Sequence, residues 1–192
     1  MSLIHLLESR QLFAISLTPT PALPAPDPIF GEEFTAPFYL RADHVLRVNG
    51  SAGDDAIAFS RNAAGWVAEL NGVSRMYAPA DVTGFRAYGN TGNDSIEVSG
   101  GVWLATTLDG GDGHDTVSGG SGPDTIYGQG GNDTLRGNIG NDKLFGGYGM
   151  DTLTGQAGAD EFRGGDDYDT VSYDDDVLRL GGVTVYFNGL TD

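Results

Sequence analysis

Residues Gly110–Ser172 decide the fold of this chain, and they read GGDGHDTVS GGSGPDTIY GQGGNDTLR GNIGNDKLF GGYGMDTLT GQAGADEFR GGDDYDTVS. Each of these seven nine-residue phrases begins with glycine, has aspartate at its sixth position and has an apolar residue at its eighth. A fixed short period is the signature of a repeat architecture in which every unit packs on its neighbours. The segment is therefore predicted to form a solenoid.

Each phrase combines a turn with a short strand. Its first six residues are rich in glycine, which reaches positive φ without a steric penalty and so permits sharp turns. The side chains of its last three residues are predicted to point out, in and out, as in a strand that buries one face. Successive phrases are predicted to occupy opposite sides of a flattened coil of 18 residues. Parallel strands of neighbouring coils would then lie about 4.8 Å apart.

The predicted fold class is all-β, a parallel β-roll. One sheet is expected to bury Val117, Leu135, Leu153 and Val171, and the opposite sheet Ile126, Leu144 and Phe162. These few apolar side chains face the large conformational entropy of a glycine-rich chain. Stacked aspartates also oppose folding, because like charges about 5 Å apart repel by about 3 kcal/mol at an effective dielectric of about 20. Without a cation, a disordered acidic tract is the expected state.

Calcium is the cation that fits the donors of this segment. Carboxylates and the backbone carbonyls of tight turns are hard oxygen donors, and calcium accepts six to eight oxygens in irregular geometry. Magnesium requires a stricter octahedron and keeps its water. The chain has no cysteine and only one histidine, His114, among the repeats, which suits soft or nitrogen-seeking metals poorly. The candidate ligands are the sixth-position aspartates Asp115, Asp124, Asp133, Asp142, Asp151, Asp160 and Asp169.

Stacking of the coils predicts one column of aspartates on each narrow edge. Within the repeats, the first column contains Asp115, Asp133, Asp151 and Asp169, and the second contains Asp124, Asp142 and Asp160. The gaps within these columns number three and two, so about five calcium ions are expected, each bound by carboxylates and backbone carbonyls of both flanking turns. Candidate carbonyl donors are Gly111, Gly113, Gly120, Gly122, Gly131, Gly140, Gly149 and Gly158. Asp112 and Asp166, at third positions, either add a ligand or face water.

The phrase follows the pattern GGxGxDxUx, in which U is a large apolar residue. Residues 110–172 thereby resemble the calcium-binding nonapeptide repeats of the RTX (repeats-in-toxin, haemolysin-type) proteins. The resemblance implies a β-roll, calcium-dependent folding and bacterial export, hence a secreted, extracellular protein or one at the bacterial cell surface. The departures from the pattern are Gln129, Asn138 and Gln156 at second positions and Asp167 at a fourth position.

The composition restricts the classes of partner. With 31 glycines and a formal net charge of −17 in 192 residues, the chain is unsuited to nucleic acid or anionic membranes. No apolar stretch approaches the length of a transmembrane helix. The absence of cysteine fits an exported bacterial protein without disulfides. We expect a monomer that binds calcium, and an extracellular polysaccharide or a cell-surface partner is the open alternative.

Four segments are predicted along the chain. Residues 1–30 are expected to be a flexible leader with a proline-rich linker. Within them Leu6–Ala14 (LLESRQLFA) resembles the leader of large planctomycete-like exported proteins, and a frayed amphipathic helix is the alternative. Residues 31–108 are an irregular β region, residues 109–176 the β-roll, and residues 177–192 a closing strand.

The irregular β region is expected to cap the N-terminal end of the roll, as a β-solenoid or a meander. The segment Asn62–Gly65 separates two strand-like runs, and Asn71-Gly72 predicts a second hairpin turn. Two degenerate phrases, GSAGDDAI and GNTGNDSI, place Asp55 and Asp94 39 and 21 residues before the next sixth-position aspartate, so the coil rhythm is broken. Asp94 is a weaker candidate metal ligand, and Asp55 is expected to cap a turn.

The motifs favour a protein without catalytic activity. The sequence contains neither the HExxH motif of zinc proteases nor the G-x-S-x-G elbow of serine hydrolases. Together with the export that the resemblance implies, this leads us to expect an exported calcium-binding module that folds when the ion binds. The alternative is the C-terminal repeat region of a larger secreted enzyme or surface adhesin, whose catalytic part lies outside this chain.

Overall fold

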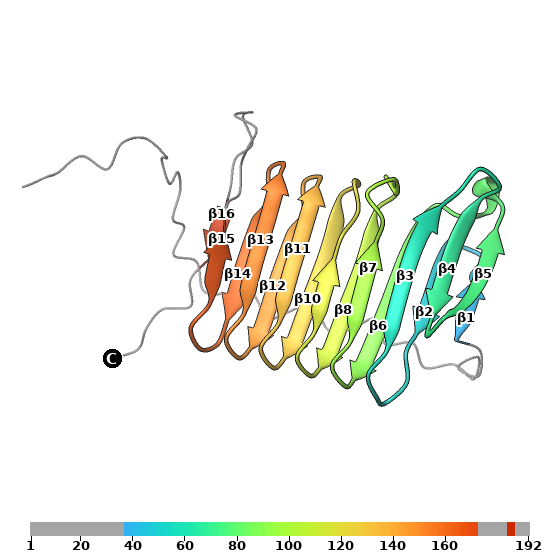
Figure 1. The fold of residues 1–192 in the computed structure, drawn as a ribbon. Coiled ribbons are helices and arrows are strands. Elements are labelled where there is room, and N and C mark those ends of the chain that lie inside the picture. Colours follow the sequence, from blue (N-terminus) through green and yellow to red (C-terminus); the bar gives the residue numbers. More distant parts are fainter. Residues whose placement is uncertain (1–36, 173–183, 187–192) are drawn as a thin grey trace, which may run out of the picture.

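This computed structural model describes residues 37–172 and 184–186, which are almost entirely β. Figure 1 shows two sheets running side by side along one axis, with the N-terminal strands at one end and the repeats at the other. The helical structure in the described ranges is the short 3-10 turn η1 (Pro79–Asp81), and no described helix is long and apolar enough to cross a membrane. The leader expected in residues 1–30 lies outside the described residues.

Each sheet contains eight strands. Sheet A has the spatial order β1 (Phe38–Leu40), β2 (Val45–Asn49), β6 (Gly84–Thr91), β8 (Thr106–Asp112), β10 (Asp124–Gly130), β12 (Lys143–Tyr148), β14 (Glu161–Gly165) and β16 (Thr184–Tyr186). Sheet B has the spatial order β15 (Thr170–Ser172), β13 (Thr152–Ala157), β11 (Thr134–Ile139), β9 (Thr116–Ser118), β7 (Ser95–Val98), β3 (Ala56–Arg61), β4 (Trp66–Leu70) and β5 (Val73–Tyr77).

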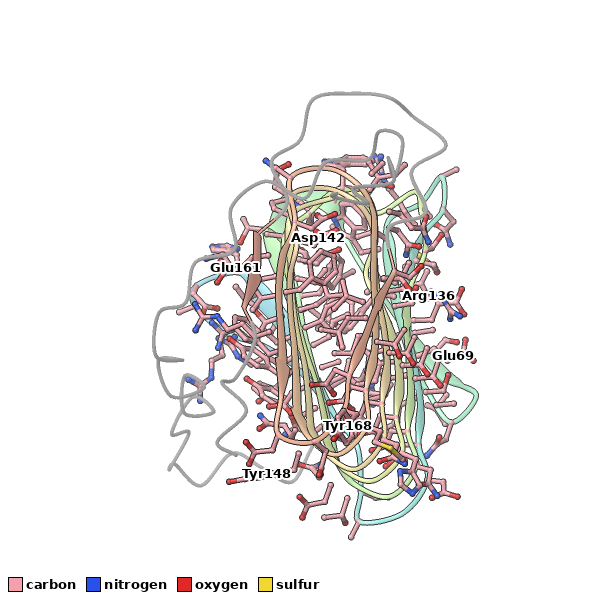
Figure 2. All side chains as sticks on the ribbon, turned by 90° about the vertical axis from the view of Figure 1, so that its left-hand side faces the viewer. Glu69, Arg136, Asp142, Tyr148, Glu161 and Tyr168 are labelled. Atoms are coloured by element: carbon pink, nitrogen blue, oxygen red, sulfur yellow. The ribbon has the colours of Figure 1, made fainter. Side chains whose placement is uncertain are left out.

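In the repeat block the strands are parallel, and each residue pairs with the residue 18 positions further along the chain. Leu135 pairs with Leu153 between β11 and β13, and Ile126 pairs with Leu144 between β10 and β12. Seen along the axis, one turn of chain is a flattened coil with a sheet on each long side and a bend at each narrow edge (Figure 2). The predicted parallel β-roll is confirmed.

Several strands are longer than the three residues predicted for each phrase. β11 begins at Thr134 as expected but continues to Ile139, because Asn138 and Ile139 still pair with Gln156 and Ala157 of β13. Parallel pairing therefore extends into the first positions of the next phrase. Glycines there allow neighbouring backbones to approach closely.

The eighth-position side chains form the core of the roll. Those with no exposed area are Val117, Leu135 and Leu153 of sheet B and Ile126, Leu144 and Phe162 of sheet A. Val171, in the last described coil, is partly buried against them. The column of sheet A continues backwards through Leu108 and Ala87, and that of sheet B through Ile96 and Ile57. One continuous core thus runs through the repeats and the preceding region.

The irregular region before the repeats continues the same coil and adds a hairpin unit to it. β2 and β6 of sheet A, and β3 and β7 of sheet B, pair in parallel with their neighbours along the axis. Both predicted hairpins are confirmed, since β3–β4 and β4–β5 are antiparallel. Asn71 and Gly72 have φ values of 51° and 79°, which suits a turn that follows the twist of the strands.

This hairpin unit accounts for the first break in the coil rhythm. Asp55 and Asp94 are 39 residues apart, 21 more than the 18 of a regular coil, and β4, β5 and η1 occupy the excess. Trp66 of β4 packs edge-on against Phe85 with ring centroids 5.4 Å apart, and Phe85 lies 4.6 Å from Phe59. The inserted strands therefore close the N-terminal end of the core with aromatic side chains, as an irregular β cap.

An aromatic pair lies on the outer face of sheet A. Tyr127 stacks on Phe145 with ring centroids 5.0 Å apart and an interplanar angle of 12°. The Arg163 guanidinium lies 5.3 Å from the centre of the Phe145 ring. These contacts connect three successive coils and stabilise their alignment.

Leu135→Ala is expected to lower the free energy of unfolding by about 2–5 kcal/mol in the presence of calcium, because it leaves a cavity between Val117 and Leu153. The control is Arg136→Ala at the exposed next position, which should change the same free energy by less than about 0.5 kcal/mol. Urea unfolding followed by circular dichroism measures both. Equal losses in the two variants would contradict the placement of Leu135 in the core.

Candidate metal centre

The glycine-rich halves of the phrases form the turns at the narrow edges of the coil. Gly131 has a φ of 124°, and a Cβ on it would collide with the carbonyl oxygen of Gly113 in the preceding coil. Glycine is the residue that tolerates both this conformation and this close approach. Successive turns therefore stack with their backbones in contact, and the aspartate that ends each turn stacks with them.

The sixth-position aspartates form the two columns that the spacing predicts. One column contains Asp115, Asp133, Asp151 and Asp169, and the other contains Asp124, Asp142 and Asp160. Within each column the backbone N–H of one aspartate donates a hydrogen bond to the Oδ1 of the aspartate one coil later, with N···O distances of 2.8–3.0 Å. This bond fixes the axial register of neighbouring turns.

The first column is longer than predicted. The Asp94 N–H donates to Asp115 Oδ1 at 2.7 Å, and the Asp55 N–H donates to Asp94 Oδ1 at 2.7 Å. The column therefore extends upstream of the repeats, to Asp94 and Asp55. The extra residues between Asp55, Asp94 and Asp115 do not shift the coil, so these three aspartates remain aligned in one column.

The carboxylates of both columns are buried with too few partners. Six of the seven predicted aspartates are 1–3% exposed, and Asp169 is half-buried. Figure 2 shows Asp142 at one narrow edge of the coil and Tyr148 and Tyr168 at the opposite edge. Among the described residues, buried Oδ2 atoms without a hydrogen-bond partner belong to Asp94, Asp115, Asp133, Asp142 and Asp151. An unpaired carboxylate oxygen is costly to bury, so a cation beside these atoms would be stabilising.

Burial also changes the acidity of these carboxyl groups. Desolvation raises the pKa of Asp115, Asp142 and Asp151 from 3.8 to about 7, and neighbouring aspartates add to the rise. Desolvation likewise raises the pKa of Asp124 and Asp133, against hydrogen bonds that lower it. A cation in the columns would favour the ionised carboxylates and displace their protons.

Backbone carbonyls lie beside the unpaired carboxylate oxygens. A Cβ built on Gly128 would collide with Asp133 Oδ2 of its own turn and would lie 2.7 Å from the Gly146 carbonyl oxygen of the next turn. A Cβ built on Gly146 would likewise collide with Asp151 Oδ2 of its own turn and with the Gly164 carbonyl oxygen of the next turn. Oxygen donors from two stacked turns thus converge beside the first glycine of a phrase, in a space that any side chain would fill.

The first-position carbonyls lie within the predicted range of carbonyl donors, positions one to five, but are not among the individually named glycines. The signal that could have identified them is the glycine at the first position of all seven phrases. Four of the predicted donors are fourth-position glycines whose carbonyl oxygens contact the fourth-position glycine one coil later on the same edge. In order, the carbonyls of Gly113, Gly122, Gly131 and Gly140 contact Gly131, Gly140, Gly149 and Gly158.

The remaining predicted site residues have different surroundings. Gly111 packs against the backbone of Asn90. Gly120 donates its N–H to Asp124 Oδ2 at 2.7 Å, and its carbonyl accepts the N–H of Ile139. Asp112 and Asp166 are both exposed, which favours the alternative that they face water.

The residues that replace glycine in the turns keep the glycine conformation. The φ values are 81° for Gln129, 72° for Asn138, 67° for Gln156 and 71° for Asp167. Asn138 stabilises its turn by donating from Nδ2 to the Gly119 carbonyl oxygen at 2.6 Å. The last turn keeps its place in the stack, because Asp169 still accepts the N–H of Asp151 at 3.0 Å.

The arrangement differs from a metal cluster built of side chains alone. Within residues 37–172, no group of three or more Asp, Glu or His side chains is placed to hold a metal ion. The Nδ1 of His114 accepts the N–H of Asn132 at 2.8 Å and so takes part in turn stacking. The donors that fit a cation are instead a carboxylate oxygen of one turn and a backbone carbonyl oxygen of the next, which are hard oxygen donors of the kind calcium binds.

Comparison with known proteins agrees with this geometry. No curated protein and no solved structure matches the chain. The family model of the RTX calcium-binding nonapeptide repeat, four copies long, matches residues 109–144 and again residues 136–171. Together these matches cover the seven phrases whose aspartates form the columns. Residues 109–171 are therefore a block of RTX calcium-binding nonapeptide repeats, folded as a β-roll.

Proposed function

We propose that this chain is an exported, non-catalytic module whose β-roll folds when it binds calcium. The observation that supports this function best is the burial of aspartates whose Oδ2 atoms have no partner in the described part of the chain. Ionised and without a counter-ion, these carboxylates oppose folding. With calcium bound, the same oxygens become ligands, and the free energy of binding becomes free energy of folding.

The proposed ligands are the sixth-position aspartates of the repeats, with about five ions in the block. Calcium would supply positive charge between two turns and would accept the carbonyl oxygens beside the carboxylates. The chain's own residues fix the position of these donors. The hydrogen bond from one aspartate N–H to the next Oδ1 sets the spacing of the turns, as at Asp133 and Asp151. The glycines keep the space beside each carboxylate open.

Dependence on calcium would link folding to location. Inside a cell free calcium is scarce, so the repeats would stay unfolded and competent for export. Outside, calcium at about 10⁻³ M would meet sites of the affinity typical of extracellular modules. Each occupied site adds RT ln(1 + [L]/Kd) to stability, so several weak sites together fold the roll. An extracellular polysaccharide or a cell-surface partner remains a prediction, as does the monomeric state.

Purified chain in excess chelator is expected to give the circular dichroism spectrum of a largely unordered chain in its repeat block. Millimolar calcium should convert this spectrum to that of a β protein in a cooperative transition, because the ion neutralises the buried columns. Equal magnesium is the control and should not produce the change. A β spectrum with cooperative melting in chelator would contradict the proposal.

Asp133→Ala is expected to raise the calcium concentration at the folding midpoint by about tenfold, equivalent to about 1.4 kcal/mol. Asp133 is 2% exposed and is bonded to turns on both sides, so its loss affects two neighbouring gaps. The matched control is Asp112→Ala, which removes an exposed aspartate from the same block and should leave the midpoint unchanged. Equal shifts in the two variants would contradict shared ligation by the columns.

The raised pKa values give folding without metal a defined pH dependence. Below about pH 4 the carboxyls of Asp115, Asp142 and Asp151 are protonated in both the folded and the unfolded chain. Between about pH 4 and about pH 7 the folded chain retains protons that the unfolded chain has released. The free energy of unfolding of the metal-free chain therefore falls as pH rises through this window, and the loss is complete above it.

Metal-free protein is accordingly expected to show more β structure at about pH 5 than at about pH 8. Calcium affinity should change in the opposite direction, because the ion binds the ionised carboxylates and releases their protons. Circular dichroism of the metal-stripped chain measures the first trend, and calorimetric titration at the two pH values measures the second. A metal-free chain that gains structure as pH rises would contradict the assigned burial of the columns.

A further inference from the structure

Asp94 lies upstream of the matched repeats but shares the environment of their aspartates. It is 2% exposed, and its Oδ1 accepts the Asp55 N–H. Its Oδ2 is buried and has no hydrogen-bond partner within the described ranges. A carboxylate oxygen in this state requires either a proton or a cation.

Oxygen donors from two turns also meet at Asp94. A Cβ built on Gly89 would collide both with Asp94 Oδ2 and with the carbonyl oxygen of Gly110 in the next coil. The same two kinds of oxygen meet at Gly128 in the middle of the repeats. The turn has the repeat conformation as well, since Asn90 and Gly92 have φ values of 80° and 124°.

Asp55, the first aspartate of the same column, is different because protein donors satisfy its carboxylate. Its Oδ2 accepts hydrogen bonds from the Ser51 N–H at 2.6 Å and the Ser51 hydroxyl at 3.0 Å. Its Oδ1 accepts the Nδ2 of Asn71 at 2.6 Å. These donors perform the charge compensation that a cation would otherwise supply.

Asp124 is the first aspartate of the second column, and protein donors satisfy its carboxylate as they do that of Asp55. Its Oδ2 accepts the Gly120 N–H, and its Oδ1 accepts the Thr106 N–H at 3.1 Å and the Thr106 hydroxyl at 2.7 Å. The donors Ser51 and Gly120 occupy the second position of their turns, and neither adopts the positive φ found in the other turns. A change of turn conformation thus brings one backbone N–H onto the carboxylate at the start of each column.

We propose that the gap between the turns of Asp94 and Asp115 is a calcium site outside the matched repeats, and that the gap between the turns of Asp124 and Asp142 holds no ion. The site would use Asp94 Oδ2, the Gly110 carbonyl and the Asp115 carboxylate. This inference rests on the proposed function. It adds one ion to the first column, beside Asp94, and removes one from the second column, beside Asp124. It also couples the N-terminal β cap to the roll, because the ion joins the turns before β7 and β9.

The test is the number of calcium ions bound by the full-length chain, measured by equilibrium dialysis at saturating calcium. Asp94→Asn keeps an oxygen for the Asp55 N–H but removes the charge, and it is expected to bind one ion fewer than the wild type. Asp55→Asn removes a buried charge at a capped turn outside the repeats and is the matched control, expected to retain the full count. Asp124→Asn tests the second part of the inference, which predicts that no ion is lost. An unchanged count in Asp94→Asn, or a lower count in Asp124→Asn, would overturn the inference.

The outcomes separate this inference from the proposed function. A wild-type chain that binds several ions while Asp94→Asn binds just as many would refute the new site and leave calcium-dependent folding intact. A wild-type chain that binds no calcium would refute both. If Asp94→Asn does not fold, anomalous diffraction from wild-type crystals grown with calcium decides, with a peak expected beside Asp94 and none beside Asp124. A peak beside Asp124 and none beside Asp94 would refute the inference.

Discussion

Compensation of buried carboxylate charge is the interaction on which the rest of this structure depends. Five turns each place an aspartate almost entirely out of solvent, use its Oδ1 to accept an N–H of the preceding coil, and leave its Oδ2 without a partner among the described residues; these are the turns of Asp94, Asp115, Asp133, Asp142 and Asp151. The same requirement explains the glycines, because stacked turns at this spacing have no room for a Cβ beside the carboxylate. The nine-residue period, the register of stacked coils and the oxygen donors available to a cation therefore all depend on this one turn arrangement.

Because each coil contacts its neighbours along one axis, additions at one coil do not disturb the others. The β4–β5 hairpin enlarges one coil, yet Asp55, Asp94 and Asp115 remain in a single column. Each column begins with an aspartate that protein donors neutralise, namely Asp55 through Ser51 and Asp124 through Gly120. The start of each column is thereby closed by hydrogen bonds, whereas the Oδ2 atoms of Asp94, Asp115, Asp133, Asp142 and Asp151 have no partner in the described part of the chain.

Much of this fold and site follows from the sequence, because the period is expressed in every phrase. The inward positions of Leu135 and Ile126, the parallel register and the two aspartate columns all follow from counting residues. The start of the first column does not, because a spacing of 21 residues does not reveal that Asp94 returns to the line of Asp115. The capping of Asp124 depends on the φ of Gly120, and glycine carries no sequence signal for that choice. The extended strands arise from contacts between coils that no single phrase encodes.

The most direct test of the account is the radius of gyration of the full chain, measured by small-angle X-ray scattering with chelator and with calcium at equal ionic strength. A compact chain of this length has a radius of about 16 Å and an unfolded one about 47 Å. Calcium is expected to contract the chain strongly, towards the radius of an elongated but compact roll. The same compact radius in excess chelator as in calcium, at neutral pH, would contradict the claim that cations hold the stacked turns together.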